Sequence, residues 1–315
     1  MSYVLVIGAG GQIGTELVLA LRKKHGKHQV VAADIKTECP PLLSSGPYVQ
    51  MDVLNRDAVR NYIIYKEFDE IYLLAALLSA TAEKNPDFAW RLNMEGLITI
   101  LNLAKEGHVK KVFWPSSIAV FGPSTPLDNT PQTTVMEPTT VYGISKLAGE
   151  RWCEYYHTKF GVDVRSIRYP GLISYKSPPG GGTTDYAVDI FYKAKAGKPF
   201  KSFLKEDTML PMMFMDDAIR ATLEIMDAPK KAIRIRSAYN LAGISFTPKQ
   251  LSEAIQKIIP SFQITYCPDF RQQIADTWPN SIDDSQATHD WNWKHQFDID
   301  AVARIMLKKV NLNNF

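Results

Sequence analysis

Tyr3-Val4-Leu5-Val6-Ile7-Gly8-Ala9-Gly10-Gly11-Gln12-Ile13-Gly14 runs from an apolar segment directly into a cluster of glycines. The first five residues are the short β-branched run that is typical of a buried parallel strand. After the glycines, Ile13, Leu17 and Leu21 recur on one face of a helix. Glycine allows a tight turn and a close approach of the backbone to a pyrophosphate, whose charge the helix N-terminus receives. Strand, glycine turn and helix together predict a dinucleotide site, although Gly8-x-x-Gly11-x-x-Gly14 departs slightly from the usual spacing.

Asp34 ends the next expected strand, Gln29 to Asp34, twenty residues after Gly14. A carboxylate there accepts hydrogen bonds from the adenosine ribose hydroxyls and repels a 2′-phosphate, which predicts NAD rather than NADP. The alternative is a helix-cap or turn aspartate. Asp52 follows a third strand, Tyr48 to Met51, and is either an adenine contact or a plain turn residue.

Later segments continue the same alternation of strands and helices. We expect strands at Ile71–Leu78, Lys110–Trp114 and Gly161–Tyr169, and a long helix that starts at Pro86. The pattern predicts an α/β fold with a Rossmann-type, doubly wound parallel sheet and right-handed crossovers.

The C-terminal third lacks this regularity and is expected to form a smaller substrate-binding domain. We place the NAD-binding domain at residues 1–172, with a return segment near 212–240, and a mainly substrate-binding domain at 173–315. Helices are expected at Tyr186–Ala196 and Pro248–Ile259. The glycine-rich loop Lys176–Asp185 is expected to close on the substrate.

Composition bounds the possible functions. The net charge of +3 is too small to indicate nucleic-acid binding, and no apolar run is long enough to cross a bilayer. Cys39, Cys153 and Cys267 are widely separated, so neither a disulfide framework nor a metal site is indicated. Because a strand begins almost at Met1, no targeting peptide is expected, and we predict a soluble cytoplasmic protein.

Tyr142-Gly143-Ile144-Ser145-Lys146 carries the strongest indication of chemistry. A tyrosine and a lysine four residues apart lie on one helical face, about 5–6 Å apart at Cβ, and a nearby ammonium favours the phenolate. Alone, such a pair is more often a surface contact. Here Ser116-Ser117 ends a strand about twenty-five residues earlier, where groups of a parallel sheet face the ligand.

These motifs together resemble the extended short-chain dehydrogenase/reductase superfamily. The less generic segments Pro115–Gly122, Arg168–Ile173, Gly180–Ala187, Ala275–Pro279 and Asp290-Trp291 look like those of the short-chain type of L-threonine 3-dehydrogenase, across nearly the whole chain. The resemblance implies NAD-dependent oxidation of the L-threonine 3-hydroxyl to L-2-amino-3-oxobutanoate. It also implies a homodimer with a four-helix interface built from the Tyr142 and Asn93 helices.

The resemblance also implies residue roles. Tyr142 would be the general base, Lys146 would bind the nicotinamide ribose, Ser117 would bond the reacting oxygen, and Asn93 would hold a water for proton relay. By itself, Asn93 fits a surface amide or a structural role equally well. We expect the cofactor to contact Gly8, Gly11, Gln12, Ile13, Asp34, Ile35, Asp52, Val53, Leu74, Ala75, Ala76, Asn93, Tyr142, Lys146, Tyr169 and Leu172.

A zwitterionic amino acid needs donors for its carboxylate and an apolar wall for its methyl group. Thr183 and Thr184 offer hydroxyl and backbone donors near a helix start, unless they only cap that helix. Trp278 offers the wall, unless it is a core residue. Ser79 is a further contact candidate or a surface serine. With Ser117 and Tyr142, these residues form the expected substrate site.

Two other functions remain open. A sugar-nucleotide epimerase or dehydratase of the same superfamily would share the fold, the cofactor and the tyrosine base. A nucleotide sensor without catalysis would keep the fold alone, and it has no need of Tyr142, Lys146 and Ser117 together.

Overall fold

The structure, a computed structural model, describes residues 2–176 and 182–312, without the side chains of residues 79 and 80. Six parallel strands form its central sheet in the order β3-β2-β1-β4-β5-β7. Their bounds are β1 Val4–Ile7, β2 Val30–Asp34, β3 Tyr48–Gln50, β4 Glu70–Leu73, β5 Lys111–Phe113 and β7 Val164–Arg165. Because the order reverses beside β1, the sheet is doubly wound, which confirms the predicted Rossmann fold.

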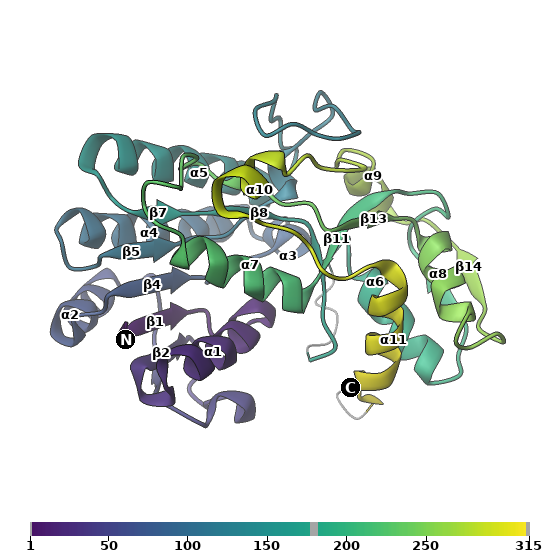
Figure 1. Cartoon of the computed structure of the whole chain (residues 1–315), viewed down its shortest axis with the longest axis horizontal. Coiled ribbons are helices and arrows are strands. Elements are labelled where there is room, and N and C mark those ends of the chain that lie inside the picture. The colour runs from purple at the N-terminus through teal and green to yellow at the C-terminus, as the bar shows by residue number, and fades with distance from the viewer. Residues whose placement is uncertain (1, 177–181, 313–315) are drawn as a thin grey trace. The chain divides into compact units, whose positions relative to one another are not determined.

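The sheet lies between two layers of helices (Figure 1). Leu5, Ile7, Ile71 and Leu73 alternate along β1 and β4 and pack with apolar side chains from α2, α4 and α5 on one face. Helix α1 and the later part of α7 cover the other face. The helices concerned are α1 Gln12–His25, α2 Arg56–Lys66, α3 Ser79–Ala82, α4 Pro86–Lys105, α5 Val141–Phe160 and α7 Met215–Asp227. Helical turns of the 3₁₀ type occur at η1 Lys27–Gln29, η2 Pro41–Leu43 and η3 Ile118–Val120.

Side chains define where the two long helices begin. The Asn85 side chain accepts a hydrogen bond from the Phe88 amide, with Pro86 at the first turn of α4. The Thr140 hydroxyl accepts from the Gly143 amide at 3.1 Å and so starts α5 just before Tyr142. Gly161, at φ 71°, ends α5 in the left-handed conformation.

The fourth strand is shorter than predicted. It ends at Leu73 rather than at Leu78. The amides of Leu74 and Ala75 both donate to the Ile7 carbonyl, and Leu77 is bonded through its backbone to the side chain of Asn93. These contacts turn the chain away from the sheet, so residues 74–78 do not pair as a strand.

The chain forms two compact units, each made of separate segments. The first contains Met1–Ser117, Thr140–Arg168 and Ile219–Tyr239, and the second contains Ile118–Thr139, Tyr169–Ala218 and Asn240–Phe315. The sequence boundary at residue 172 placed 118–139 with the N-terminal part. In the structure this segment is bonded within the second unit, where the Thr130 amide donates to Ser281 and the Asn240 side chain donates to Thr130.

The second unit contains small sheets and helices. Strands β13, β11 and β9 form one sheet, in which β9 and β11 are parallel, while β10 and β14 form another. The first unit also contains most of a three-stranded sheet with the order β12-β8-β6. The remaining strands are β6 Ser116–Ser117, β8 Ile167–Tyr169, β9 Gly171–Ile173, β10 Phe200–Ser202, β11 Leu210–Phe214, β12 Tyr239–Asn240, β13 Ile244–Phe246 and β14 Ile264–Tyr266. The remaining helices are α6 Tyr186–Lys195, α8 Pro248–Gln256, α9 Phe270–Ala275, α10 Ser285–Trp291 and α11 Ile299–Lys309.

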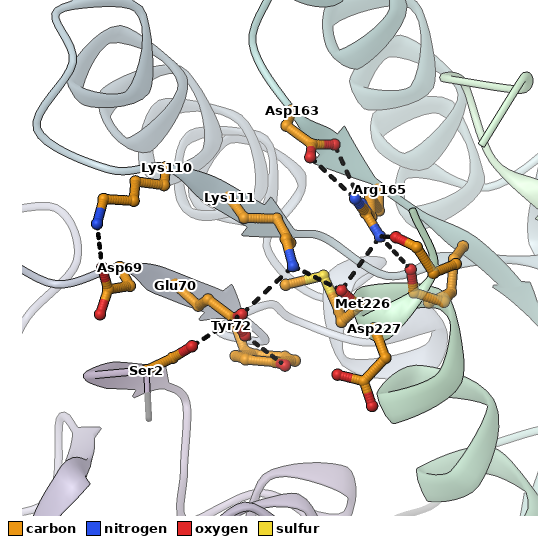
Figure 2. Close-up of polar contacts among 12 residues, drawn as sticks. Ser2, Asp69, Glu70, Tyr72, Lys110, Lys111, Asp163, Arg165, Met226 and Asp227 are labelled. Carbon is orange, nitrogen blue, oxygen red and sulfur yellow. Dashed lines mark hydrogen bonds and ion pairs between the residues drawn. The ribbon is translucent and has the colours of Figure 1, made fainter. Parts of the chain in front are cut away.

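A network of polar side chains lies at the amino ends of β4, β5 and β7 (Figure 2). Lys111 Nζ lies between the Glu70 carboxylate and the Met226 carbonyl, at 3.4 and 2.6 Å, and Tyr72 donates to Glu70 at 3.1 Å. Arg165 donates to the carbonyls of residues 225, 226 and 228 and is itself held by Asp163. The network therefore satisfies the carbonyls at the end of α7, which the helix itself leaves unpaired. Among the described residues, no helix is long and apolar enough to span a membrane.

Candidate active site

The glycine turn between β1 and α1 is built by close backbone contacts. Gly8 has φ 87°, a conformation that favours glycine, and a Cβ on it would lie 2.6 Å from the Ala75 amide nitrogen. A Cβ on Gly14 would lie 2.3 Å from the Gly8 carbonyl oxygen. Gly11 differs, because the nearest atom to its Cβ would be 3.4 Å away. Two of the three glycines are thus required by the turn itself, and Gly11 leaves space at the helix start.

The N-terminus of α1 is suited to an anion. Gly11 is its N-cap, and among the described residues no side chain caps the helix and no acidic residue lies in its first turn. Helices α4, α5 and α8 each have a capping side chain. Free amides at a helix start, together with the helix dipole, bind phosphate groups. Gln12 and Ile13, the first helical residues, are half-buried beside this start.

Asp34 faces this turn from the end of β2. Its Oδ2 accepts from the Gly10 amide at 2.7 Å and its Oδ1 accepts from the Lys36 amide at 3.3 Å. The carboxylate is buried and oriented, as expected for a group that binds a ribose diol. The uncapped helix and this carboxylate together fit a dinucleotide.

The other expected cofactor residues occupy different environments. Ile35 is 65% exposed, which is unusual for isoleucine and leaves its surface available to a ligand. Asp52 accepts from the Leu54 amide at 2.9 Å, so it does form the turn considered from the sequence. Val53 is buried against Gly96. Leu74, Ala75 and Ala76 are half-buried beside the glycine turn, and Tyr169 and Leu172 belong to the second unit.

Tyr142, Ser117, Lys146 and Asn93 all lie in the first unit. Tyr142 is in the first turn of α5, and its hydroxyl is hydrogen-bonded to Ser117. The surrounding protein raises the pKa of Tyr142 to about 12, and the Ser117 bond acts in the opposite direction. The sequence led us to expect a lowered phenol pKa, but in the chain alone desolvation outweighs the favourable contacts.

The Lys146 ammonium is enclosed by protein. Its Nζ donates to the Pro115 carbonyl at 2.6 Å and lies 4.4 Å from the centre of the Trp114 ring and 5.5 Å from that of Tyr142. Burial lowers the pKa of Lys146 to about 7, while the negative charge of Glu150 raises it. A lysine with this pKa can change its protonation state in the neutral range.

Asn93 is hydrogen-bonded to two segments of the site. Its Oδ1 accepts from the Leu77 amide at 2.9 Å, and its Nδ2 donates to the Leu77 carbonyl and to Ser145 Oγ. Ser145 donates in turn to the Tyr142 carbonyl. The amide of Asn93 therefore links the chain after β4 to the first turn of α5, the structural role considered from the sequence.

Thr183, Thr184 and Trp278 lie in the second unit. Thr183 is buried, and its Oγ1 has no hydrogen-bond partner among the described residues. A Cβ on Gly171 would meet the Thr184 methyl group at 2.6 Å, and Trp278 is largely buried. Ser79 starts α3, but its side chain is outside the described part of the chain. Residues 177–181 of the predicted closing loop Lys176–Asp185 are also outside it.

Several contributors were not identified from the sequence. Trp114 supports Lys146, and it fits only because residue 149 is glycine: a Cβ there would lie 2.2 Å from the Trp114 ring. Glu150 is buried and bonded to Ser116 and Arg168. The spacing Lys146-x-x-x-Glu150 was a usable signal for Glu150, since it places both charges on one helical face.

Comparison with known proteins agrees with this geometry. Residues 4–242 match the model of the NAD dependent epimerase/dehydratase family. An uncharacterized epimerase/dehydratase of Staphylococcus saprophyticus is 48% identical over 312 residues, which cover 98% of this chain and 97% of that protein.

Two solved structures are similar over the whole chain. A GalE-like L-threonine dehydrogenase from Cupriavidus necator, in its holo form, is 52% identical with a TM-score of 0.96, covering 98% of this chain and 99% of that one. A monomeric L-threonine 3-dehydrogenase from a metagenome, in its apo form, is 45% identical with a TM-score of 0.94, covering 99% and 100%.

Replacing the two kinds of glycine should have different effects. Gly14→Ala forces a Cβ against the Gly8 carbonyl, and such overpacking costs about 1–3 kcal/mol of unfolding free energy. Gly11→Ala has ordinary backbone angles and space, so it should leave the unfolding midpoint unchanged while weakening NAD binding. Urea unfolding and calorimetric titration with NAD measure the two effects. Equal stability of both variants would contradict the assignment of Gly14.

Proposed function

The chain belongs to the NAD-dependent epimerase/dehydratase family, and from this premise we propose that it oxidises L-threonine at its 3-hydroxyl to L-2-amino-3-oxobutanoate, with NAD as hydride acceptor. The observation that carries the proposal is the Tyr142–Ser117 hydrogen bond beside the buried Lys146, within a chain 52% identical to an L-threonine dehydrogenase over almost its full length. That the chain is an NAD-dependent enzyme follows from the family; the reaction and the substrate are the proposed part.

The uncapped start of α1 would hold the pyrophosphate of NAD, and Asp34 would accept from the adenosine ribose hydroxyls and disfavour NADP. Ile35, Val53 and the Leu74–Ala76 segment would line the adenosine side. When bound, NAD would accept the hydride, and its oxidised form would carry positive charge. The remaining steps belong to the side chains of the chain itself.

Tyr142 would take the proton of the threonine hydroxyl as carbonyl character develops. A phenol with a pKa near 12 is a poor base, so positive charge from Lys146 and from the cofactor must favour its ionised form. Ser117 would donate to the substrate oxygen and orient it toward Tyr142. Asn93 would keep the first turn of α5 in place, with water relay as its second proposed role.

The second unit would supply the amino-acid contacts. Thr183 presents a buried hydroxyl that no described residue satisfies, and a substrate carboxylate would satisfy it. Thr184, at the start of α6, and Ser79 are proposed as further donors. Trp278 is proposed as the wall for the threonine methyl group.

The competing function is a sugar-nucleotide epimerase or dehydratase. The name of the Staphylococcus saprophyticus relative and of the matched family favours this class in general terms. Such an enzyme regenerates its NAD in every cycle and binds a nucleotide diphosphate. It should therefore retain NAD on dialysis and turn over nucleotide sugars.

We expect NADH to form, with absorbance at 340 nm, when the protein receives NAD and L-threonine. D-threonine, L-allo-threonine and NADP serve as matched negatives, and a nucleotide-sugar panel tests the competing function. Conversion of a nucleotide sugar without oxidation of L-threonine would reject the proposal. Binding of NAD without any turnover would instead favour the sensor.

Tyr142→Phe should lower kcat by about 10²–10⁴-fold, the usual contribution of a general base, while NAD still binds. Tyr156→Phe is the matched control on the same helix, because Tyr156 also loses a hydrogen-bonded hydroxyl, at 2.8 Å from Asn102. Steady-state rates and NAD titrations of both variants provide the measurement. If Tyr142→Phe retained wild-type kcat, another group would have to be the base.

We also propose a homodimer formed through α4 and α5. Helix α5 exposes Trp152, Tyr155 and Phe160, each more than 40% exposed, and α4 exposes Phe88 and Trp90. An aromatic face of this kind is typical of protein interfaces. Sedimentation analysis should give a dimer that Trp152→Asp dissociates, whereas Ile258→Asp, at an exposed residue of the second unit, should not. A monomeric wild-type protein, as described for the metagenome enzyme, would exclude the dimer.

A further inference from the structure

Glu150 is a fully buried carboxylate that the proposed reaction does not use. It is 0% exposed and lies on α5 one turn after Lys146 and two turns after Tyr142. Residues four apart on a helix share one face, so the three side chains point toward the same neighbouring segment. That segment is residues 115–117, which follow β5.

Both oxygens of the Glu150 carboxylate accept hydrogen bonds. Oε1 accepts from Ser116 Oγ at 2.6 Å and from Arg168 Nε at 2.8 Å, and Oε2 accepts from Arg168 Nη2 at 2.7 Å. Arg168 is itself 1% exposed. Burying such a pair often costs more in desolvation than its attraction returns, so stability alone is a weak reason for its presence.

Each of three consecutive residues is bonded to a different turn of α5. Ser117 is bonded to Tyr142, the Pro115 carbonyl accepts from Lys146, and Ser116 donates to Glu150. The hydroxyls of Ser117 and Tyr142 are the two proposed to contact the reacting oxygen. Their separation therefore depends on the two neighbouring bonds, which fix the segment along the helix.

We propose that Glu150, held by Arg168, is a positioning residue for the reaction. Through Ser116 it fixes Ser117 against Tyr142, and through its charge it keeps Lys146 an ammonium. The positioning role is measured by turnover, so it rests on the proposed function. Arg168 acts on Glu150 and not on the substrate.

The groups facing Lys146 support the second role. On α5 these are Tyr142, Glu150 and Cys153, while the chain after β5 offers the Pro115 carbonyl and the Trp114 ring. Burial raises the pKa of Cys153, so this thiol is neutral at physiological pH. Among these groups, Glu150 is therefore the negative charge that raises the pKa of Lys146 against the effect of burial.

The positioning role is tested with Ser116→Ala, which removes one hydroxyl and leaves the Glu150–Arg168 pair. We expect kcat to fall about 10-fold to 100-fold, as for a small misplacement of reacting groups, with the Kd for NAD unchanged. Tyr72→Phe is the matched control. It also removes a buried hydroxyl bonded to a carboxylate, that of Glu70, but at the opposite ends of the strands (Figure 2).

The charge role is tested with Glu150→Gln, with Glu70→Gln as the control for loss of a carboxylate paired with Lys111. Removing a negative charge lowers the pKa of Lys146. The alkaline limb of the kcat–pH profile, where the ammonium is lost, should then move about one unit to lower pH. Neither Ser116→Ala nor Glu70→Gln should move that limb.

Two outcomes would overturn the inference. The first is a Ser116→Ala enzyme with kcat within twofold of wild type, or a Tyr72→Phe enzyme with an equal loss. The second concerns the titration of Lys146, followed by its ¹³Cε resonance in lysine-labelled protein and assigned with Lys146→Met. An equal midpoint in wild type and Glu150→Gln would exclude the charge role.

The Lys146 titration needs no substrate. Suppose that the protein does not oxidise L-threonine but that Glu150→Gln shifts the midpoint of the Lys146 titration as expected. The proposed function would then be rejected, and the charge role of Glu150 would stand.

Discussion

The site is organised around one buried ammonium group. Lys146 is buried away from water, so its ammonium group requires a hydrogen-bond acceptor, an aromatic ring face and a counter-charge close by. The Pro115 carbonyl, the Trp114 ring and Glu150 supply these in turn. Because Trp114 must lie beneath the ammonium, residue 149 must be glycine. The Glu150 carboxylate is in turn hydrogen-bonded to Arg168. The burial of one lysine thereby accounts for the residues at positions 114, 149 and 150.

The two ends of the central sheet carry polar groups for different purposes. At the amino ends, Lys111 is paired with Glu70, and Lys111 and Arg165 donate to the last carbonyls of α7. At the carboxyl ends, the first amides of α1 have no capping side chain among the described residues, and Asp34 is oriented toward them. Parallel strands place all such ends at one edge, where α/β proteins bind ligands. At the amino edge, the polar groups are bonded within the protein and stabilise the fold. At the carboxyl edge, the uncapped amides of α1 are available to a ligand.

Local patterns predicted the parts of the protein that depend on local physics. The strand, glycine turn and helix of residues 3–14 predicted the sheet, because apolar period and glycine placement are properties of adjacent residues. The roles of Trp114 and Arg168 were missed, because each depends on a partner more than fifteen residues away. The strand predicted to end at Leu78 failed for a similar reason: Asn93, from the next long helix, binds the Leu77 backbone. Which roles the second-unit residues Thr183 and Trp278 perform is still a prediction.

Neither compact unit is a continuous piece of chain. The chain passes from one unit to the other after residues 117, 139, 168, 218 and 239. During synthesis, the first unit is complete only when residue 239 has emerged from the ribosome, and by then much of the second unit is already present. The two units must therefore mature together. Gene fusion or recombination could not exchange one unit for a foreign domain by a single cut, so either unit would have to change by substitution within its own segments.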